Sequence, residues 1–92
     1  MSATPSEISE QVRTFLRDNL LYMRPDYLLQ DHSKLLEERV IDSMGVMELI
    51  GFLEQQFGIG VRDEEVTEVN LGTVASITAY VGAKLDTNHG AT

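Results

Sequence analysis

One stretch of the chain decides its fold: Leu36 to Gly58 has the sequence LEERVIDSMGVMELIGFLEQQFG. Its residues predict a helix from Ser43 to Phe57, and Gly58 is a typical residue just beyond a helix C-terminus. Helical geometry places several of its apolar residues on one face, which we expect to lie in the core of a helical bundle. These residues are Val46, Leu49, Ile50, Leu53 and Phe57.

Ser43 is predicted to cap this helix, because a serine oxygen can accept hydrogen bonds from the first free backbone N–H groups. The same position places its hydroxyl at the positive end of the helix dipole, where a phosphate is favoured. Asp42 adds a carboxylate that could hold a metal ion or an arginine of a visiting enzyme. The two residues alone leave open whether Ser43 is only a cap.

The helix face opposite the apolar stripe carries Met44, Met47, Glu48 and Gly51. Methionine is flexible and polarisable, and it suits surfaces that must fit several partners. Two interpretations are open: this face docks partner proteins, or the long segment before Ser43 covers the methionines.

The rest of the chain is also expected to be helical. Thr4-Pro5-Ser6-Glu7 is typical of a helix start, and the first helix should end near Asn19 or Leu20. Leu21 to Asp42 is interpreted as a long ordered crossover lying on the helices, with a short helical turn over Asp26 to Gln30. The apolar stripe of the first helix consists of Ile8, Val12, Phe15, Leu16 and Leu20.

A short third helix is predicted to open at Asp63-Glu64-Glu65-Val66, and Asn70 to Thr73 to form a turn. A fourth helix follows, with Val74, Ile77, Val81 and Leu85 on one face. The prediction is an all-α domain over residues 1–86, with three main helices, one short helix and a long first loop. Residues 87–92 are expected to be a flexible C-terminal tail.

Composition limits the function classes. The 92 residues suit one domain, and the absence of cysteine excludes disulfides and cysteine-based metal sites, so a cytoplasmic location is expected. No apolar run predicts a membrane span, and the start lacks the pattern of a signal peptide. The net charge is −8, of which residues 36–70 contribute −7 (nine acids and two arginines). The electrostatic field of this negative charge repels nucleic acid and anionic membranes and favours partners with basic patches. A second interpretation stays open, in which the acidic surface only keeps the protein soluble.

Taken together, these residues resemble a known family. Leu36 to Ile50 resembles the attachment-site region of acyl carrier proteins. The resemblance continues through most of the chain and implies the four-helix bundle of that family, with residues 1–86 as the carrier domain. It continues through Phe52-Leu53-Glu54, Phe57-Gly58-Ile59, Asp63-Glu64-Glu65 and Val74 to Val81.

The resemblance implies that Ser43 receives 4′-phosphopantetheine from coenzyme A, installed by a separate transferase that uses magnesium and recognises Asp42. The thiol of this arm would hold an acyl or aminoacyl group as a thioester, presented to loading enzymes and to downstream synthases or tailoring enzymes. A monomeric carrier with no catalytic residue and no metal of its own is implied. The partner-binding surface would consist of Met44, Met47, Glu48 and Glu54. The cargo pocket would be lined by Val46, Leu49 and Ile50.

Two positions depart from the family pattern. Gly45 stands where many fatty-acid carriers have an acid, and the sequence around it resembles discrete carriers that serve biosynthetic gene clusters or adenylate-forming ligases. Arg39 stands where such relatives often have glycine. A cation there could stabilise the phosphodiester or pair with Glu38 or Asp42, and the ion pair is our favoured expectation.

Other functions fit less well. Ile41-x-Ser43-x-Gly45 is half of a hydrolase nucleophile elbow, but the elbow needs a preceding strand, and His32 and His89 lie in polar segments. A calcium loop would need alternating acids, which the consecutive Asp63-Glu64-Glu65 lacks. The remaining alternative is a small acidic helical interaction module without a prosthetic group, in which Ser43 is only a cap.

Overall fold

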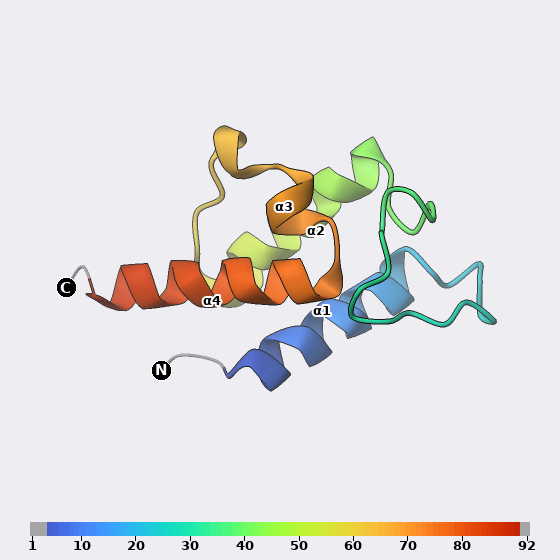
Figure 1. Ribbon diagram of the computed structural model, residues 1–92, viewed down its shortest axis with the longest axis horizontal. Helices are drawn as coiled ribbons and strands as arrows, with labels where there is room; N and C mark the ends of the chain where they lie inside the picture. The colour runs from blue at the N-terminus through green and yellow to red at the C-terminus, as the bar shows by residue number, and fades with distance from the viewer. Residues whose placement is uncertain (1–3, 91–92) are drawn as a thin grey trace.

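A computed structural model describes residues 4–90, with side chains placed for residues 4–86 (Figure 1). This part of the chain contains no strand, so the all-α prediction is confirmed. The helix predicted over 43–57 is confirmed at both ends. In chain order the elements are α1 (Pro5–Asn19), α2 (Ser43–Phe57), a single 3-10 turn η1 (Asp63–Glu65), α3 (Glu68–Leu71) and α4 (Val74–Gly90).

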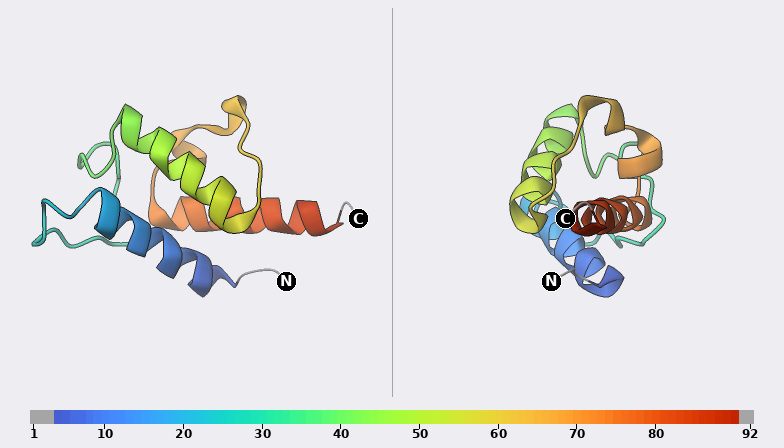
Figure 2. Two further views of the ribbon diagram at one scale, coloured as in Figure 1. Left: turned by 180° about the vertical axis from the view of Figure 1, so that it is seen from behind. Right: turned by 90° about the vertical axis from the view of Figure 1, so that its left-hand side faces the viewer.

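Helices α1 and α4 lie side by side and run in opposite directions, and they form the most extensive helix pair (Figures 1 and 2). Helix α2 crosses over this pair in the same general direction as α4, and the short α3 packs against α4. The long first loop leaves the end of α1 and returns to the start of α2 at the same end of the bundle. This arrangement places Ser43 where α2 meets the loop.

The predicted start of α1 is confirmed. Thr4 Oγ1 accepts a hydrogen bond from the backbone N–H of Glu7 at 3.2 Å, and Glu7 Oε1 accepts one from the N–H of Thr4 at 3.4 Å. These reciprocal bonds satisfy donors that the first turn of a helix otherwise leaves free. The helix then buries Ile8, Val12 and Leu16 against α4 and the loop.

The core is apolar and draws on every helix and on the first loop. From α2, Leu49 and Leu53 are fully buried, whereas Val46, Ile50 and Phe57 of the predicted stripe are only half-buried at its border. Fully or nearly fully buried apolar side chains outside α2 are Ile8, Val12, Leu16, Leu35, Val40, Ile41, Val74, Ile77 and Val81.

The first loop is ordered, as predicted, but it contains no helical turn over Asp26 to Gln30. The backbone turns at Arg24–Tyr27 and is then irregular through Gln30. Arg13 of α1 explains the difference, since its guanidinium donates to the carbonyl of Leu29 at 2.8 Å and bonds the Asp31 carboxylate. These bonds hold the irregular segment against α1, where Leu29 is buried.

The third helix differs from its prediction. Asp63–Glu65 forms only one 3-10 turn, and α3 follows at Glu68–Leu71, partly where a turn from Asn70 was expected. Thr67 caps α3 by accepting from the N–H of Asn70 at 3.3 Å, and Leu71 enters the core. The helix forms here because burying Leu71 stabilises it more than the acidic residues stabilise a helix one turn earlier.

Helix α4 extends to Gly90, four residues beyond the expected end. The boundary at residue 86 and the flexibility of the tail stay predictions, and residues 91–92 lie outside the described residues. Within the part of the chain that the structure describes, no helix is long and apolar enough to cross a membrane.

Candidate functional site

Asp42, and not Ser43, caps α2. Asp42 has an extended backbone, and its Oδ1 accepts a hydrogen bond from the N–H of Gly45 at 2.7 Å. Ser43 is the first helical residue. The prediction that Ser43 is the cap is therefore wrong, because the carboxylate one residue earlier reaches the free N–H of the first turn. Aspartate and serine are about equally good caps, so the sequence Asp-Ser did not decide between them.

As a consequence, the hydroxyl of Ser43 is free. The side chain is exposed, and it forms no hydrogen bond to any of residues 4–86. It stands at the N-terminus of a 15-residue helix, where partial positive charge favours an anion such as a phosphate ester. The residues before it form turns and irregular backbone, and this geometry excludes the strand that a nucleophile elbow requires.

Gly45 is in close contact with its surroundings. A Cβ at this position would meet Ile41 Cγ1 at 2.9 Å and Leu20 Cδ2 at 3.5 Å. The first turn of α2 thus lies directly on the end of the loop and on the end of α1. This packing gives a structural reason for glycine at a position where many fatty-acid carriers have an acid.

Arg39 has a left-handed backbone, with φ of 59°, which favours glycine. Contrary to our expectation, it forms no ion pair with Glu38 or Asp42 within the described residues. Both carboxylates are engaged elsewhere. Glu38 accepts from Tyr27 Oη at 2.5 Å and from the N–H of Lys34 at 3.3 Å, whereas Asp42 caps α2.

Arg24, which the sequence did not single out, holds this part of the loop. Its Nη1 donates to the carbonyl of Glu38 at 3.0 Å and to that of Arg39 at 3.3 Å, and its guanidinium lies 4.6 Å from the centre of the Tyr27 ring. Burial and the bond to Glu38 raise the pKa of Tyr27, so the phenol stays protonated as a donor. The left-handed turn before Ser43 is therefore fixed by side chains from the middle of the loop.

The predicted docking face of α2 is exposed. Met44 and Met47 are 76% and 67% exposed, so the alternative in which the loop covers them is wrong. Glu48 and Glu54 are exposed as well. Glu54 has a second role, because its Oε2 accepts from the N–H of Val61 at 3.0 Å and holds the segment after α2.

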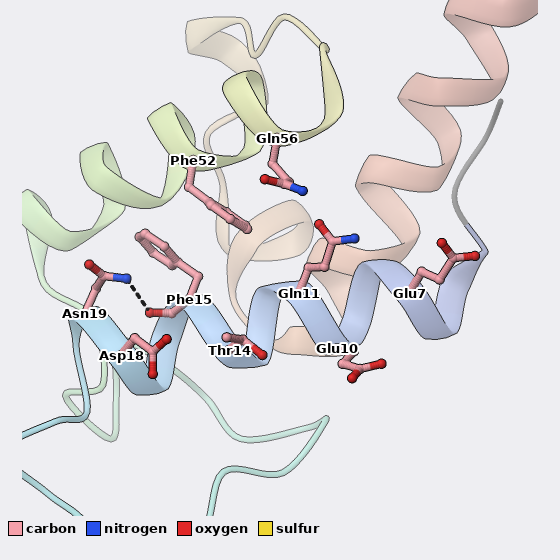
Figure 3. A pocket seen from close by; sticks show the side chains of 9 residues that line it. All are labelled: Glu7, Glu10, Gln11, Thr14, Phe15, Asp18, Asn19, Phe52 and Gln56. Atoms are coloured by element: carbon pink, nitrogen blue, oxygen red, sulfur yellow. Dashed lines mark hydrogen bonds between the residues drawn. The ribbon is translucent and has the colours of Figure 1, made fainter.

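The residues predicted to line a cargo pocket lie at or in the core: Leu49 is fully buried, and Val46 and Ile50 are half-buried. Two surface grooves nearby have other linings. One, of about 650 Å³, contains Ser43 and lies between the end of α1, the first loop and the start of α2. The other, of about 590 Å³, lies between α1 and α2 over the stacked rings of Phe15 and Phe52 (Figure 3). A cargo site at Val46, Leu49 and Ile50 stays a prediction.

Away from Ser43, a polar cluster ties η1 to α4. Lys84 Nζ donates to Glu65 Oε1 at 2.8 Å, and Tyr80 Oη donates to the same oxygen at 3.1 Å. The bond from Lys84, together with one from the N–H of Arg62, lowers the pKa of the Glu65 carboxyl. Burial, followed by the Glu65 carboxylate, raises the pKa of Tyr80 to about 12.

Comparison with known proteins identifies the family. Residues 25–81 match the protein family described as "Phosphopantetheine attachment site". The chain is 33% identical over 75 residues to the acyl carrier protein of Campylobacter hominis, covering 82% of this chain and 90% of that protein. It is 34% identical over 76 residues to that of Akkermansia muciniphila (83% and 90%) and 32% identical over 80 residues to that of Thermosynechococcus vestitus (87% and 94%). The chain therefore belongs to the acyl carrier protein family, and its cofactor is covalently attached 4′-phosphopantetheine.

Proposed function

We propose that Ser43 is the attachment point of the 4′-phosphopantetheine arm, and that the chain holds acyl or aminoacyl intermediates as thioesters on the thiol of this arm. The observation that supports this most strongly is the free, exposed hydroxyl at the N-terminus of α2. Because Asp42 performs the capping, Ser43 can be esterified without loss of a structural hydrogen bond. Attachment and helix stability are thereby assigned to different side chains.

In the transfer step, the β-phosphate of coenzyme A moves to Ser43 together with the pantetheine. The Ser43 oxygen attacks the β-phosphorus of coenzyme A, the pyrophosphate bond breaks, and 3′,5′-adenosine diphosphate leaves while the serine proton passes to a base of the transferase. Magnesium belongs to the transferase reaction. Asp42 is exposed beside the hydroxyl, and only its Oδ1 is engaged within the described residues, so Oδ2 can contact the transferase.

Partner enzymes would dock on the exposed face of α2. Met44 and Met47 provide adaptable apolar contact, and Glu48 and Glu54 provide charges complementary to a basic patch. The acyl carrier role itself is non-catalytic, and the chain supplies no reacting group beyond the tether. We place the protein in the cytoplasm, where coenzyme A and the loading enzymes occur.

The kind of pathway that we propose rests on the departure at Gly45. Gly45 is buried and packed closely against Ile41 and Leu20, and it stands where many fatty-acid carriers have an acid, so one recognition charge of those carriers is missing here. This supports a discrete carrier that serves a biosynthetic cluster or an adenylate-forming ligase.

A thiol assay tests the attachment. The chain has no cysteine, so any thiol that survives removal of coenzyme A belongs to the arm. Incubation with coenzyme A, magnesium and a broad-specificity transferase should introduce one thiol per chain in the wild type and in Ser6→Ala, a control serine in the first turn of α1. Ser43→Ala should gain none. A protein that gains no thiol at all would instead be an interaction module without a prosthetic group.

A further inference from the structure

The groove that contains Ser43 is lined by residues that complement the arm that Ser43 would carry. We infer that the 4′-phosphopantetheine arm lies along this outer groove, between the end of α1 and the first loop, and does not enter the bundle between the helices. The inference rests on the proposed attachment at Ser43. It concerns a surface distinct from the one that Val46, Leu49 and Ile50 would form.

Position is the first argument. Grooves of about 590 and 660 Å³ lie elsewhere on the surface of the described residues and do not include Ser43, whereas Ser43 lines the groove of about 650 Å³. Its volume falls within the range of roughly 300–1,000 Å³ that small-molecule sites occupy. An arm tethered at Ser43 begins inside this groove. Its binding to the groove would be intramolecular, so it would not lose the translational and rotational entropy that a free ligand loses on binding.

Charge is the second argument. Arg39 is the one basic residue that lines the groove, and it forms no ion pair within the described residues. The one acidic residue of the lining, Asp42, is engaged through Oδ1 with the N–H of Gly45. The left-handed backbone of Arg39 is fixed by the bond from Arg24 to its carbonyl. The backbone that carries this side chain is thus fixed in the lining of the groove that contains Ser43, and the cation complements the phosphodiester, which is the only charged part of the arm.

The lining beyond Arg39 matches the rest of the arm. Tyr22 and Met23 of the loop are 67% and 78% exposed, and Leu36 is 42% exposed, an amount of free apolar surface that suits the branched methyl groups of the pantoyl unit. Asn19 donates its Nδ2 to the carbonyl of Phe15 at 3.0 Å, which leaves its Oδ1 to accept from an amide N–H of the arm.

The alternative path into the bundle is closed in this structure. Leu49, Leu53, Leu35, Val74 and Ile77 are fully buried, and an arm between them would have to separate packed side chains. The outer groove needs no such rearrangement.

The test compares apo and holo protein by nuclear magnetic resonance, after intact mass has established complete modification. We expect the largest amide shift changes in residues 19–23 and 36–43, together with nuclear Overhauser contacts from the pantoyl methyl protons to the Tyr22 ring and the Met23 methyl group. Met23→Ser removes apolar lining of the groove and should weaken the contacts from the pantoyl methyl protons to the Tyr22 ring. Leu28→Ser is the matched control, since Leu28 is 80% exposed on the same loop and does not line the groove.

The outcomes separate the two claims. Complete modification with shift changes confined to Ser43 and its immediate neighbours, or with contacts to Val46 and Ile50, would overturn the groove assignment and leave the attachment intact. No gain in mass would overturn the attachment, and the groove assignment with it. If the contacts are unchanged in holo Arg39→Ala, the Arg39 cation does not help to hold the arm in the groove.

Discussion

The Oδ1 of Asp42 and the backbone N–H of Gly45 form a 2.7 Å hydrogen bond, and this bond separates the stability of α2 from the chemistry of Ser43. Loss of an N-cap costs about 1 kcal/mol, so Asp42→Ala should lower the free energy of unfolding by about that amount in denaturant titrations. Ser43→Ala should change it by less than about 0.5 kcal/mol. Equal losses in the two variants would show that Ser43 contributes to the cap.

Gly45 and Gly51 lie on the same helix but should respond in opposite ways to alanine. At Gly45 the new Cβ would lie 2.9 Å from Ile41 Cγ1, so we expect Gly45→Ala to destabilise the protein by about 1–2 kcal/mol. At Gly51 a new Cβ would meet nothing within 4 Å apart from its chain neighbours and the backbone of its own helix, and the better helix propensity of alanine should stabilise the protein by up to about 1 kcal/mol. Thermal unfolding of both variants would measure the difference, and a shift of the same sign in both would contradict the packing described for Gly45.

At position 39 glycine should be preferred to alanine, the reverse of position 51. The left-handed backbone costs a residue with a Cβ roughly 1–2 kcal/mol, and glycine avoids this cost. Arg39→Gly should therefore be more stable than Arg39→Ala by about 1 kcal/mol after the flexibility of glycine is included. If Arg39→Ala is the more stable variant in chemical denaturation, the turn before Ser43 is not left-handed in solution.

Glu48 tests the docking face. Glu48→Lys reverses an exposed charge on α2 and should slow modification by the transferase about tenfold at low salt, because complementary charge accelerates association. Glu10→Lys makes the same change on the exposed face of α1 and serves as the control. Circular dichroism should show equal helical content in both. The hypothesis fails if the two variants react at the same rate, or if added salt does not reduce their difference.

The cluster of Glu65, Tyr80 and Lys84 should give the stability a defined pH dependence. The pKa of Glu65 is lowered by its bond with Lys84, so its contribution is present above the ordinary value of 4.5 and is lost as the pH falls through the lowered value. Glu65→Gln should therefore be less stable than the wild type at neutral pH, and the difference should vanish in acid.

The pKa of Tyr80, raised from 10.0 to about 12, affects the stability at alkaline pH. Its contribution is complete below pH 10.0 and is lost as the pH rises through about 12. Titration followed by phenolate absorbance should show one component with a midpoint of about 12 that is missing in Tyr80→Phe. A midpoint near the ordinary value would show that neither the burial of Tyr80 nor its bond with Glu65 persists in solution.

Local signals predicted the parts of the fold that are governed by local physics. The structure confirms the reciprocal cap of Thr4 and Glu7 and the bounds of α2, which follow from local sequence patterns. It also confirms most of the apolar stripes of α1 and α4, in which only Phe15, Leu20 and Leu85 are half-buried. The exposure of Met44 and Met47 was an open question, since it depends on where the loop passes.

The errors occur where tertiary contacts decide. The loop segment near Leu29 is held by Arg13, which is 16 residues away in the sequence. Helix α3 forms where Leu71 can be buried. A short stretch of sequence shows neither of these tertiary contacts. At the site, Asp42 and Ser43 were competing caps of similar strength. The missing ion pair of Arg39 depends on Tyr27, which occupies the carboxylate of Glu38.

The intact mass of the protein after incubation with coenzyme A, magnesium and a broad-specificity transferase tests the central claim most directly. The account predicts a gain of one phosphopantetheine group per chain in the wild type and in Ser6→Ala, and no gain in Ser43→Ala. A gain that persists in Ser43→Ala, or an unmodified wild type, would contradict the assignment of Ser43 as the tether.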